Sequence, residues 1–157
     1  DKYTWVDIGS SYLPSDLLAA FLYAQLENMD EITRKRKQIF NLYHKELLPL
    51  QKTGKVRLPS PSPTGKGNGH LFYIILENEK VRNNLMDYLK DNNILAVFHY
   101  LPLHLSPVSL AKGYNRKRLP VTERISKCLL RLPFYYDLTQ DEQIEVIERI
   151  VKFFQKQ

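Results

Sequence analysis

Cysteine and long apolar runs are scarce in this chain of 157 residues. A single cysteine, Cys128, excludes an intrachain disulfide, so the fold requires no oxidising compartment. No segment approaches the roughly 20 consecutive apolar residues of a membrane helix. We therefore expect a cytoplasmic protein without a membrane segment. Because Cys128 directly precedes Leu129 and Leu130, we expect a buried apolar thiol rather than a reactive one.

The composition is that of an ordinary globular protein, with 43% hydrophobic and 25% charged residues. A net charge of +6 raises the possibility of nucleic-acid binding. The basic residues gather at 34–37 and 116–118, without the interleaved aromatics of a stacking surface. The first cluster falls on a predicted helix that also carries Asp30, Glu31 and Glu46, which favours a solvated helix face. We expect no nucleic-acid partner; a positive surface also suits anionic phosphosugars.

The first regular element predicted is a helix over residues 15–48. Ser15 is a suitable N-cap and Asp16 places negative charge in the first turn. Apolar residues surround nearly the whole of its first part, 15–26, which predicts a buried helix. We expect a bend near residues 28–30 and an end at Pro49.

Shorter elements follow a Pro- and Gly-rich loop at 59–69, which lacks the residue order of a phosphate-binding glycine loop. Apolar and β-branched runs predict strands at 70–76, 94–100 and 130–132. Helices are predicted at 79–91 and 120–129. The overall order predicts an α+β fold, with the long N-terminal helix packed on a short sheet with helices.

A capping box opens the last predicted helix, with Glu142 placed to reach back to the amide of Thr139. Its apolar face is predicted from the helical spacing of four residues: Ile144, Ile147, Val151 and Phe154.

A polar cluster follows the second predicted strand, where Pro102 prevents further pairing. His99, Tyr100 and His104 emerge there together, as binding residues often do at strand ends. Hydrogen bonding to a polar substrate and structural packing both remain open. A metal site is disfavoured, because no carboxylate or thiolate accompanies the two histidines.

A second candidate segment, Gly9 to Tyr12, directly precedes the first predicted helix. Unpaired amides and the helix dipole can bind a phosphate at such a place, although a plain turn and cap explains the same residues. No Ser-His-Asp or Cys-His set can be assembled from spacing.

Four segments in order along the chain, DIGSSYLPSDLLAA (7–20), HLFY (70–73), FHYLPLH (98–104) and LRLP (130–133), together resemble the DegT/DnrJ/EryC1/StrS sugar aminotransferases. Residues 7–20, DIGSSYLPSDLLAA, resemble the family's D/E-x-G-x-N-Y-x-M-x-D/E-x-x-A-A segment. Residues 98–104, FHYLPLH, resemble its H-Y-x-P-L-H segment. The strand at 70–73, HLFY, and the closing LRLP at 130–133 with Leu138 and Thr139 complete a likeness that runs in order along the chain.

The resemblance implies the C-terminal small domain of a fold-type-I enzyme that uses pyridoxal 5′-phosphate (PLP). The implied reaction moves an amino group from glutamate to a keto carbon of a dTDP-4-keto-6-deoxyhexose, in a homodimer with interfacial active sites. By resemblance, Ser11, where the family usually has Asn, contacts the cofactor phosphate of the neighbouring subunit. Tyr12, His99, Tyr100 and His104 are the implied substrate-binding residues.

The family's Schiff-base lysine and its pyridinium-pairing aspartate precede the region that this chain resembles. We therefore assign no catalytic residue and no metal ligand, and expect a fragment that is inactive alone. Residues 1–50 would be the end of the large PLP domain and the connecting helix, and residues 51–157 the small domain. The alternative is a non-catalytic binding or regulatory domain derived from the same fold.

Overall fold

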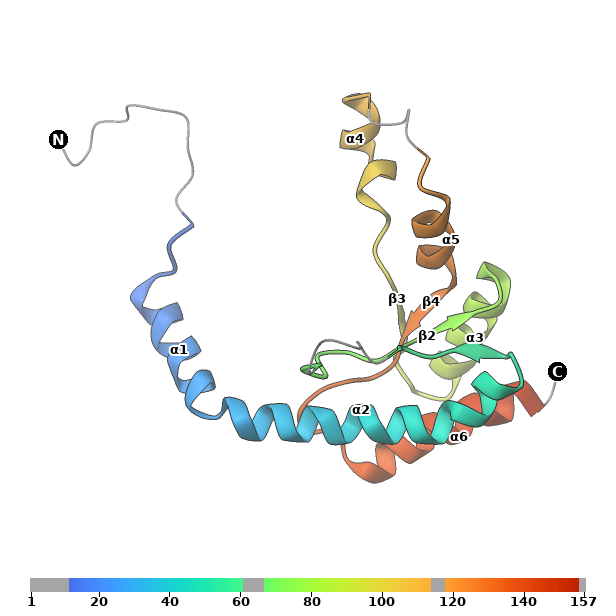
Figure 1. The fold of residues 1–157 in the computed structure, drawn as a ribbon, viewed down its shortest axis with the longest axis horizontal. Helices are drawn as coiled ribbons and strands as arrows, with labels where there is room; N and C mark the ends of the chain where they lie inside the picture. Colours follow the sequence, from blue (N-terminus) through green and yellow to red (C-terminus); the bar gives the residue numbers. More distant parts are fainter. Residues whose placement is uncertain (1–11, 61–66, 114–117, 156–157) are drawn as a thin grey trace. The chain divides into compact units, whose positions relative to one another are not determined.

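The computed structural model describes residues 12–60, 67–113 and 118–155. The chain forms two units, residues 1–32 and residues 33–157, which are described separately. Figure 1 gives the elements in chain order. Among the described residues, no helix has both the length and the apolar character needed to cross a membrane.

The first unit is built on α1 (Asp16–Glu27). The Ser15 hydroxyl accepts the Leu18 amide at 3.3 Å, which confirms the predicted N-cap. The helix breaks at Asn28, within the predicted bend, and α2 starts at Met29. The prediction of a buried helix is wrong, since no residue of α1 is buried and Phe21 is 70% exposed. Apolar composition favours burial, but burial itself requires a facing surface.

Helix α2 (Met29–Lys52) supplies one side of the core through Ile39, Tyr43 and Leu47. It continues through Pro49, so the predicted end there is wrong. Proline removes a single donor near the end of this helix. The last carbonyls remain satisfied, because the amide of Thr53 donates to Pro49 at 3.1 Å.

The sheet has four antiparallel strands in the order β1-β2-β4-β3. They are short: β1 (Val56–Arg57), β2 (Tyr73–Leu76), β3 (Val97–Phe98) and β4 (Leu129–Arg131). β1 was not predicted from the sequence, and β2 and β3 are shorter than the strands predicted at 70–76 and 94–100. The reason is pairing: β2 and β3 both bond to β4, which has only three residues.

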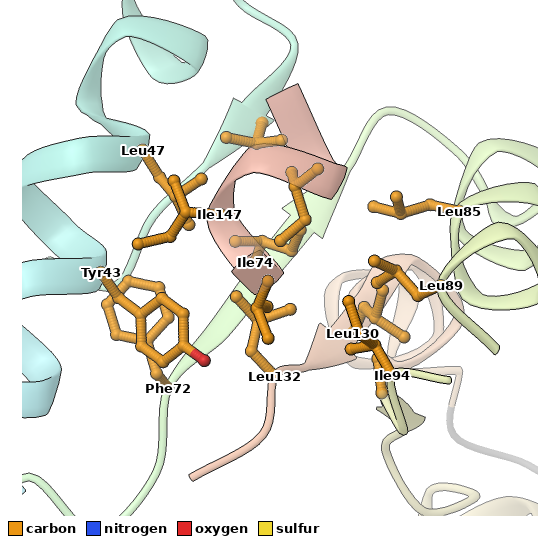
Figure 2. Close-up of a cluster of buried hydrophobic side chains, with 14 of the residues drawn as sticks. Tyr43, Leu47, Phe72, Ile74, Leu85, Leu89, Ile94, Leu130, Leu132 and Ile147 are labelled. Atoms are coloured by element: carbon orange, nitrogen blue, oxygen red, sulfur yellow. The ribbon is translucent and has the colours of Figure 1, made fainter. Parts of the chain in front are cut away.

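Helices cover the sheet face that carries Ile74 and Leu130, both fully buried. The helical core residues on this face come from α2, α3 (Glu79–Asp91) and α6 (Gln140–Gln155), and α5 (Pro120–Cys128) packs against α3. Figure 2 shows Tyr43 and Leu47 facing Ile74 from one side while Leu85 and Leu89 approach Leu130 from another. The predicted α+β fold, with a long helix packed on a short sheet, is confirmed. The predicted bounds of α3 are also confirmed, and α5 ends one residue earlier than predicted.

Helix α6 begins with the predicted capping box. The Thr139 amide donates to Glu142 Oε2 at 2.8 Å, and the Glu142 amide donates to Thr139 Oγ1 at 3.2 Å. Ile147 and Phe154 are buried as predicted, but Ile144 is exposed. Gln143 is buried instead, because its side-chain amide donates to the Ile39 carbonyl at 2.7 Å and joins α6 to α2.

The described residues between β3 and α5 form two elements that were not predicted from the sequence, the 3₁₀ turn η1 (Leu103–Leu105) and α4 (Pro107–Ala111). Cys128, the last residue of α5, is 4% exposed, which confirms a buried thiol.

Replacing Tyr43 by Phe tests the core. The Tyr43 hydroxyl, fully buried, donates to the Pro133 carbonyl at 3.0 Å. Removing it leaves that carbonyl without this donor, so Tyr43→Phe should lower the free energy of unfolding by about 1–2 kcal/mol. Urea unfolding measures the loss. Tyr23→Phe, at an exposed position on α1, is the matched control and should be neutral; equal losses in both variants would contradict the prediction.

Candidate functional site

The end of β3 is the place where the predicted binding residues emerge. β3 pairs with β4 only at Val97↔Arg131 and Phe98↔Leu130. His99 and Tyr100 follow directly, both exposed, with ring centroids 5.9 Å apart. Tyr100 is 75% exposed, so its phenol is available to a ligand. The structure thus brings these two predicted residues together.

Arg131 of β4 joins this cluster, although it was not predicted as a site residue. Its guanidinium carbon lies 5.5 Å from the centroid of the Tyr100 ring, a cation–π geometry. Its Nη2 lies 3.5 Å from the Phe98 carbonyl oxygen, at the long limit of a hydrogen bond. Its Nε is buried without a hydrogen-bond partner in the described structure. A lone arginine within an otherwise apolar strand was the available signal.

Arg82 of α3 contacts the end of β3 through the ring of Phe98. Its guanidinium carbon lies 5.5 Å from the centroid of the Phe98 ring. Its Nε donates to the Lys127 carbonyl at 3.0 Å, and its Nη2 lies 3.8 Å from Glu79. Phe98 therefore packs against a cation fixed between α3 and α5, which holds the strand end in place.

His104 is placed differently from His99 and Tyr100. It lies on η1 with a side chain only 15% exposed, and its Nε2 is 3.3 Å from Glu123 Oε1. The same carboxylate oxygen accepts the Leu119 amide at 2.9 Å. The Leu119 hydrogen bond and then the His104 contact hold the pKa of Glu123 below its ordinary value. Glu123 was also missed, because it lies 19 residues from His104 in sequence.

The remaining predicted residues lie near the N-terminus. Ser11 falls outside the described residues, so its predicted cofactor contact stays a prediction. Tyr12 is described and is 91% exposed, just before the N-cap of α1. Its predicted role in substrate binding is likewise untested.

The described residues do not form a cofactor site by themselves. PLP requires a lysine, an acid at the ring nitrogen and donors for the phosphate. One hollow does bring Lys152 together with Asp141 and Arg149, but all of its lining residues belong to α6, and one helix face cannot enclose a ring. A second hollow, between α2 and the β1–β2 edge, contains His44, Arg57 and Tyr73 but no lysine. Nor do three His, Cys, Asp or Glu side chains gather as metal ligands in the described ranges.

The family described as "DegT/DnrJ/EryC1/StrS aminotransferase family" matches residues 1–151. "Putative pyridoxal phosphate-dependent aminotransferase EpsN" of Bacillus subtilis (strain 168) is 32% identical over 154 residues, covering 97% of this chain and 39% of EpsN. "Pleiotropic regulatory protein" of Geobacillus stearothermophilus is 28% identical over 154 residues, covering 98% of this chain and 40% of that protein.

Among solved structures, S. venezuelae DesV, in complex with a ketimine intermediate, superposes with a TM-score of 0.84 at 25% identity. The superposition covers 98% of this chain and 40% of DesV. This chain therefore spans about two fifths of the length of the relatives that it matches.

The Glu123 contacts predict a specific pH dependence. The pKa of Glu123 lies below its ordinary value of 4.5 in the fold. The stabilisation by its ionised form is therefore present above about pH 4.5 and is lost as the pH falls through the folded-state pKa. Glu123→Gln should make the unfolding free energy fall less steeply between about pH 5 and 3. Thermal melts across this range measure the slope.

Glu148→Gln, an exposed change on α6, is the matched control and should keep the wild-type slope. Wild type and Glu123→Gln with the same slope would show that the carboxylate does not hold His104 and Leu119 in solution.

Proposed function

We propose that this chain, which belongs to the DegT/DnrJ/EryC1/StrS aminotransferase family, forms the C-terminal part of an enzyme that aminates a nucleotide-linked keto sugar with glutamate. The family match over residues 1–151 is the observation that carries this proposal. The likeness to EpsN and to DesV supports it independently. The fold agrees, because a helix-covered antiparallel sheet is the small domain expected of such an enzyme.

PLP is the cofactor that this function requires, and it would act as the electron sink of the reaction. Because the family's Schiff-base lysine precedes the region that this chain resembles, we assign the covalent attachment to another part of the enzyme. Ser11 would contribute one hydrogen bond to the cofactor phosphate of the neighbouring subunit. No step of the reaction is assigned to a residue of this chain.

The part that we assign to this chain is substrate binding. Tyr100 and His99 are exposed at the strand end and would hydrogen-bond the nucleotide sugar. Glu123 faces Nε2 of His104 and favours the proton on that atom. Nδ1 of His104 would then be left as an acceptor for a sugar hydroxyl. Tyr12 is a further residue that we propose for substrate binding.

The finer substrate proposal is a dTDP-4-keto-6-deoxyhexose aminated at C4. Residues 7–13, DIGSSYL, and 96–104, AVFHYLPLH, resemble the dTDP-4-amino-4,6-dideoxygalactose transaminases within the family. The net charge of +6 suits a substrate that carries a pyrophosphate. The product would serve the synthesis of a surface polysaccharide.

We further propose that residues 1–50 complete a large domain and a connecting helix, that residues 51–157 form the small domain, and that the enzyme is a homodimer. The exposed apolar side chains of α1 support an assembly that covers this helix: Leu17 is 84% exposed and Phe21 is 70% exposed. Apolar surface of this kind is typical of interfaces.

A second candidate function is a non-catalytic regulatory domain. The relative named "Pleiotropic regulatory protein" favours it, because that name describes regulation and no reaction. Cofactor binding by the full-length protein separates the two candidates.

We predict that the full-length protein will bind PLP covalently and form more than one equivalent of 2-oxoglutarate per bound cofactor from glutamate only when a nucleotide-linked 4-keto sugar is present, because the sugar must accept the amino group before the cofactor can react again. This chain alone should do neither, because the family's Schiff-base lysine precedes the region that this chain resembles. Visible absorption, mass spectrometry after borohydride reduction and a coupled 2-oxoglutarate assay measure these properties. Stoichiometric reduced cofactor on this chain alone would contradict the assignment of the lysine, and a full-length protein without bound cofactor would favour the regulatory candidate.

Tyr100→Phe in the full-length enzyme should lower kcat/KM for the keto sugar about three- to tenfold. The loss corresponds to one substrate hydrogen bond. Cofactor occupancy should stay unchanged. Tyr135→Phe, a second partly exposed tyrosine on the loop before α6, is the matched control and should keep wild-type kinetics. Wild-type kinetics in Tyr100→Phe would remove the phenol from the site.

A further inference from the structure

Tyr100 lies beyond the hydrogen-bonded part of its strand. β3 has two paired residues, and the last of them is Phe98. The chain from His99 onward therefore has no partner strand among the described elements. A binding residue needs a fixed side chain, because a loosely held group gives little affinity. Another contact must therefore hold Tyr100.

Arg131 supplies that contact. It is the residue of β4 opposite Val97, so its backbone lies in register with the paired part of β3. Its side chain then reaches two points further along β3, the Phe98 carbonyl at 3.5 Å and the Tyr100 ring at 5.5 Å. The guanidinium thus continues the attachment of β3 to β4 past the last backbone pair.

The chemistry of the guanidinium suits this task. A cation on the face of an aromatic ring restrains the ring without using its hydroxyl group. The described structure shows no hydrogen bond from the Tyr100 hydroxyl, and the residue is 75% exposed. A side chain that bonded the hydroxyl directly would occupy the group that a ligand needs. A contact through the ring leaves that group free.

The burial of the Arg131 side chain has a free-energy cost, and packing alone does not explain why the protein retains this residue. Its Nε is buried without a hydrogen-bond partner, and no ion pair of Arg131 occurs in the described ranges. A buried donor without a partner is unfavourable, and a native protein that retains one calls for an explanation. An unbranched apolar side chain such as Met would fill the same place between Tyr73 and Val97 without this penalty.

We propose that Arg131 is a positioning residue that fixes the Tyr100 ring so that its hydroxyl is presented to the nucleotide sugar. The inference rests on the proposed function, in which Tyr100 binds that sugar. Arg131 itself touches no substrate in this arrangement and acts through Tyr100.

The test is a double-mutant cycle in the full-length enzyme, with Arg131→Met, Tyr100→Leu and the double variant. Arg131→Met should raise KM for the keto sugar about two- to fivefold, the range of an exposed cation–π contact. kcat and the KM for glutamate should stay unchanged. In the Tyr100→Leu background, the same substitution should have no further effect on KM for the sugar.

Two additional variants separate positioning from structure. Arg131→Lys keeps the charge near the ring and should recover part of the loss. Arg57→Met removes an exposed arginine from β1 of the same sheet and should leave all constants unchanged. Melting temperatures show which variants fold; if Arg131→Met does not, the cycle is run with Arg131→Lys.

Equal effects of the Arg131 substitution with and without the Tyr100 ring would overturn the inference, as would a parallel rise in the KM for glutamate. A wild-type enzyme that aminates no keto sugar would overturn the proposed function and this inference with it. An active enzyme with additive variants would overturn the role of Arg131 alone.

Discussion

The hydrogen bonding of β4 on both of its edges is the interaction on which the second unit depends. β4 pairs with β2 through Leu129, Leu130 and Arg131, and with β3 through the last two of these. Successive side chains of a strand point to opposite faces. Leu130 therefore enters the core while Arg131 reaches the end of β3. A substitution that shifted the register of β4 by one residue would exchange these two roles.

Elements with local signals were predictable from the sequence, and elements defined by their partners were not. The bounds of α3 and the Thr139–Glu142 capping box depend on residues within one or two turns, and both predictions hold. The strand lengths depend on β4, which no local pattern of β2 or β3 can show. The apolar face of α6 was misplaced at Ile144 for the same reason, since Gln143 is buried through its bond to Ile39 of α2.

The residues of the candidate site also differ in whether a local sequence pattern could reveal them. His99 and Tyr100 were found because a proline closes an apolar strand beside them. Arg131 and Glu123 were not found, because they meet their partners across 33 and 19 residues of sequence. Both residues orient other side chains, and the spacing of residues along the sequence does not show such an orientation. The family likeness supplied the residues proposed to bind the ligand, whereas the contacts of these residues came from the structure.

The single cysteine gives this fold an internal reporter. Cys128 ends α5 directly before β4, is 4% exposed, and its sulfur lies 3.9 Å from the Glu77 carbonyl. A thiol reagent can reach it only when the junction between α5 and β4 opens, because a thiolate must be exposed to react. Since the chain has no second thiol, its labelling rate follows the opening of that junction without any engineered probe. The labelling rate of Cys128 thus reports the local stability of β4, the strand that carries Arg131 and begins at the next residue.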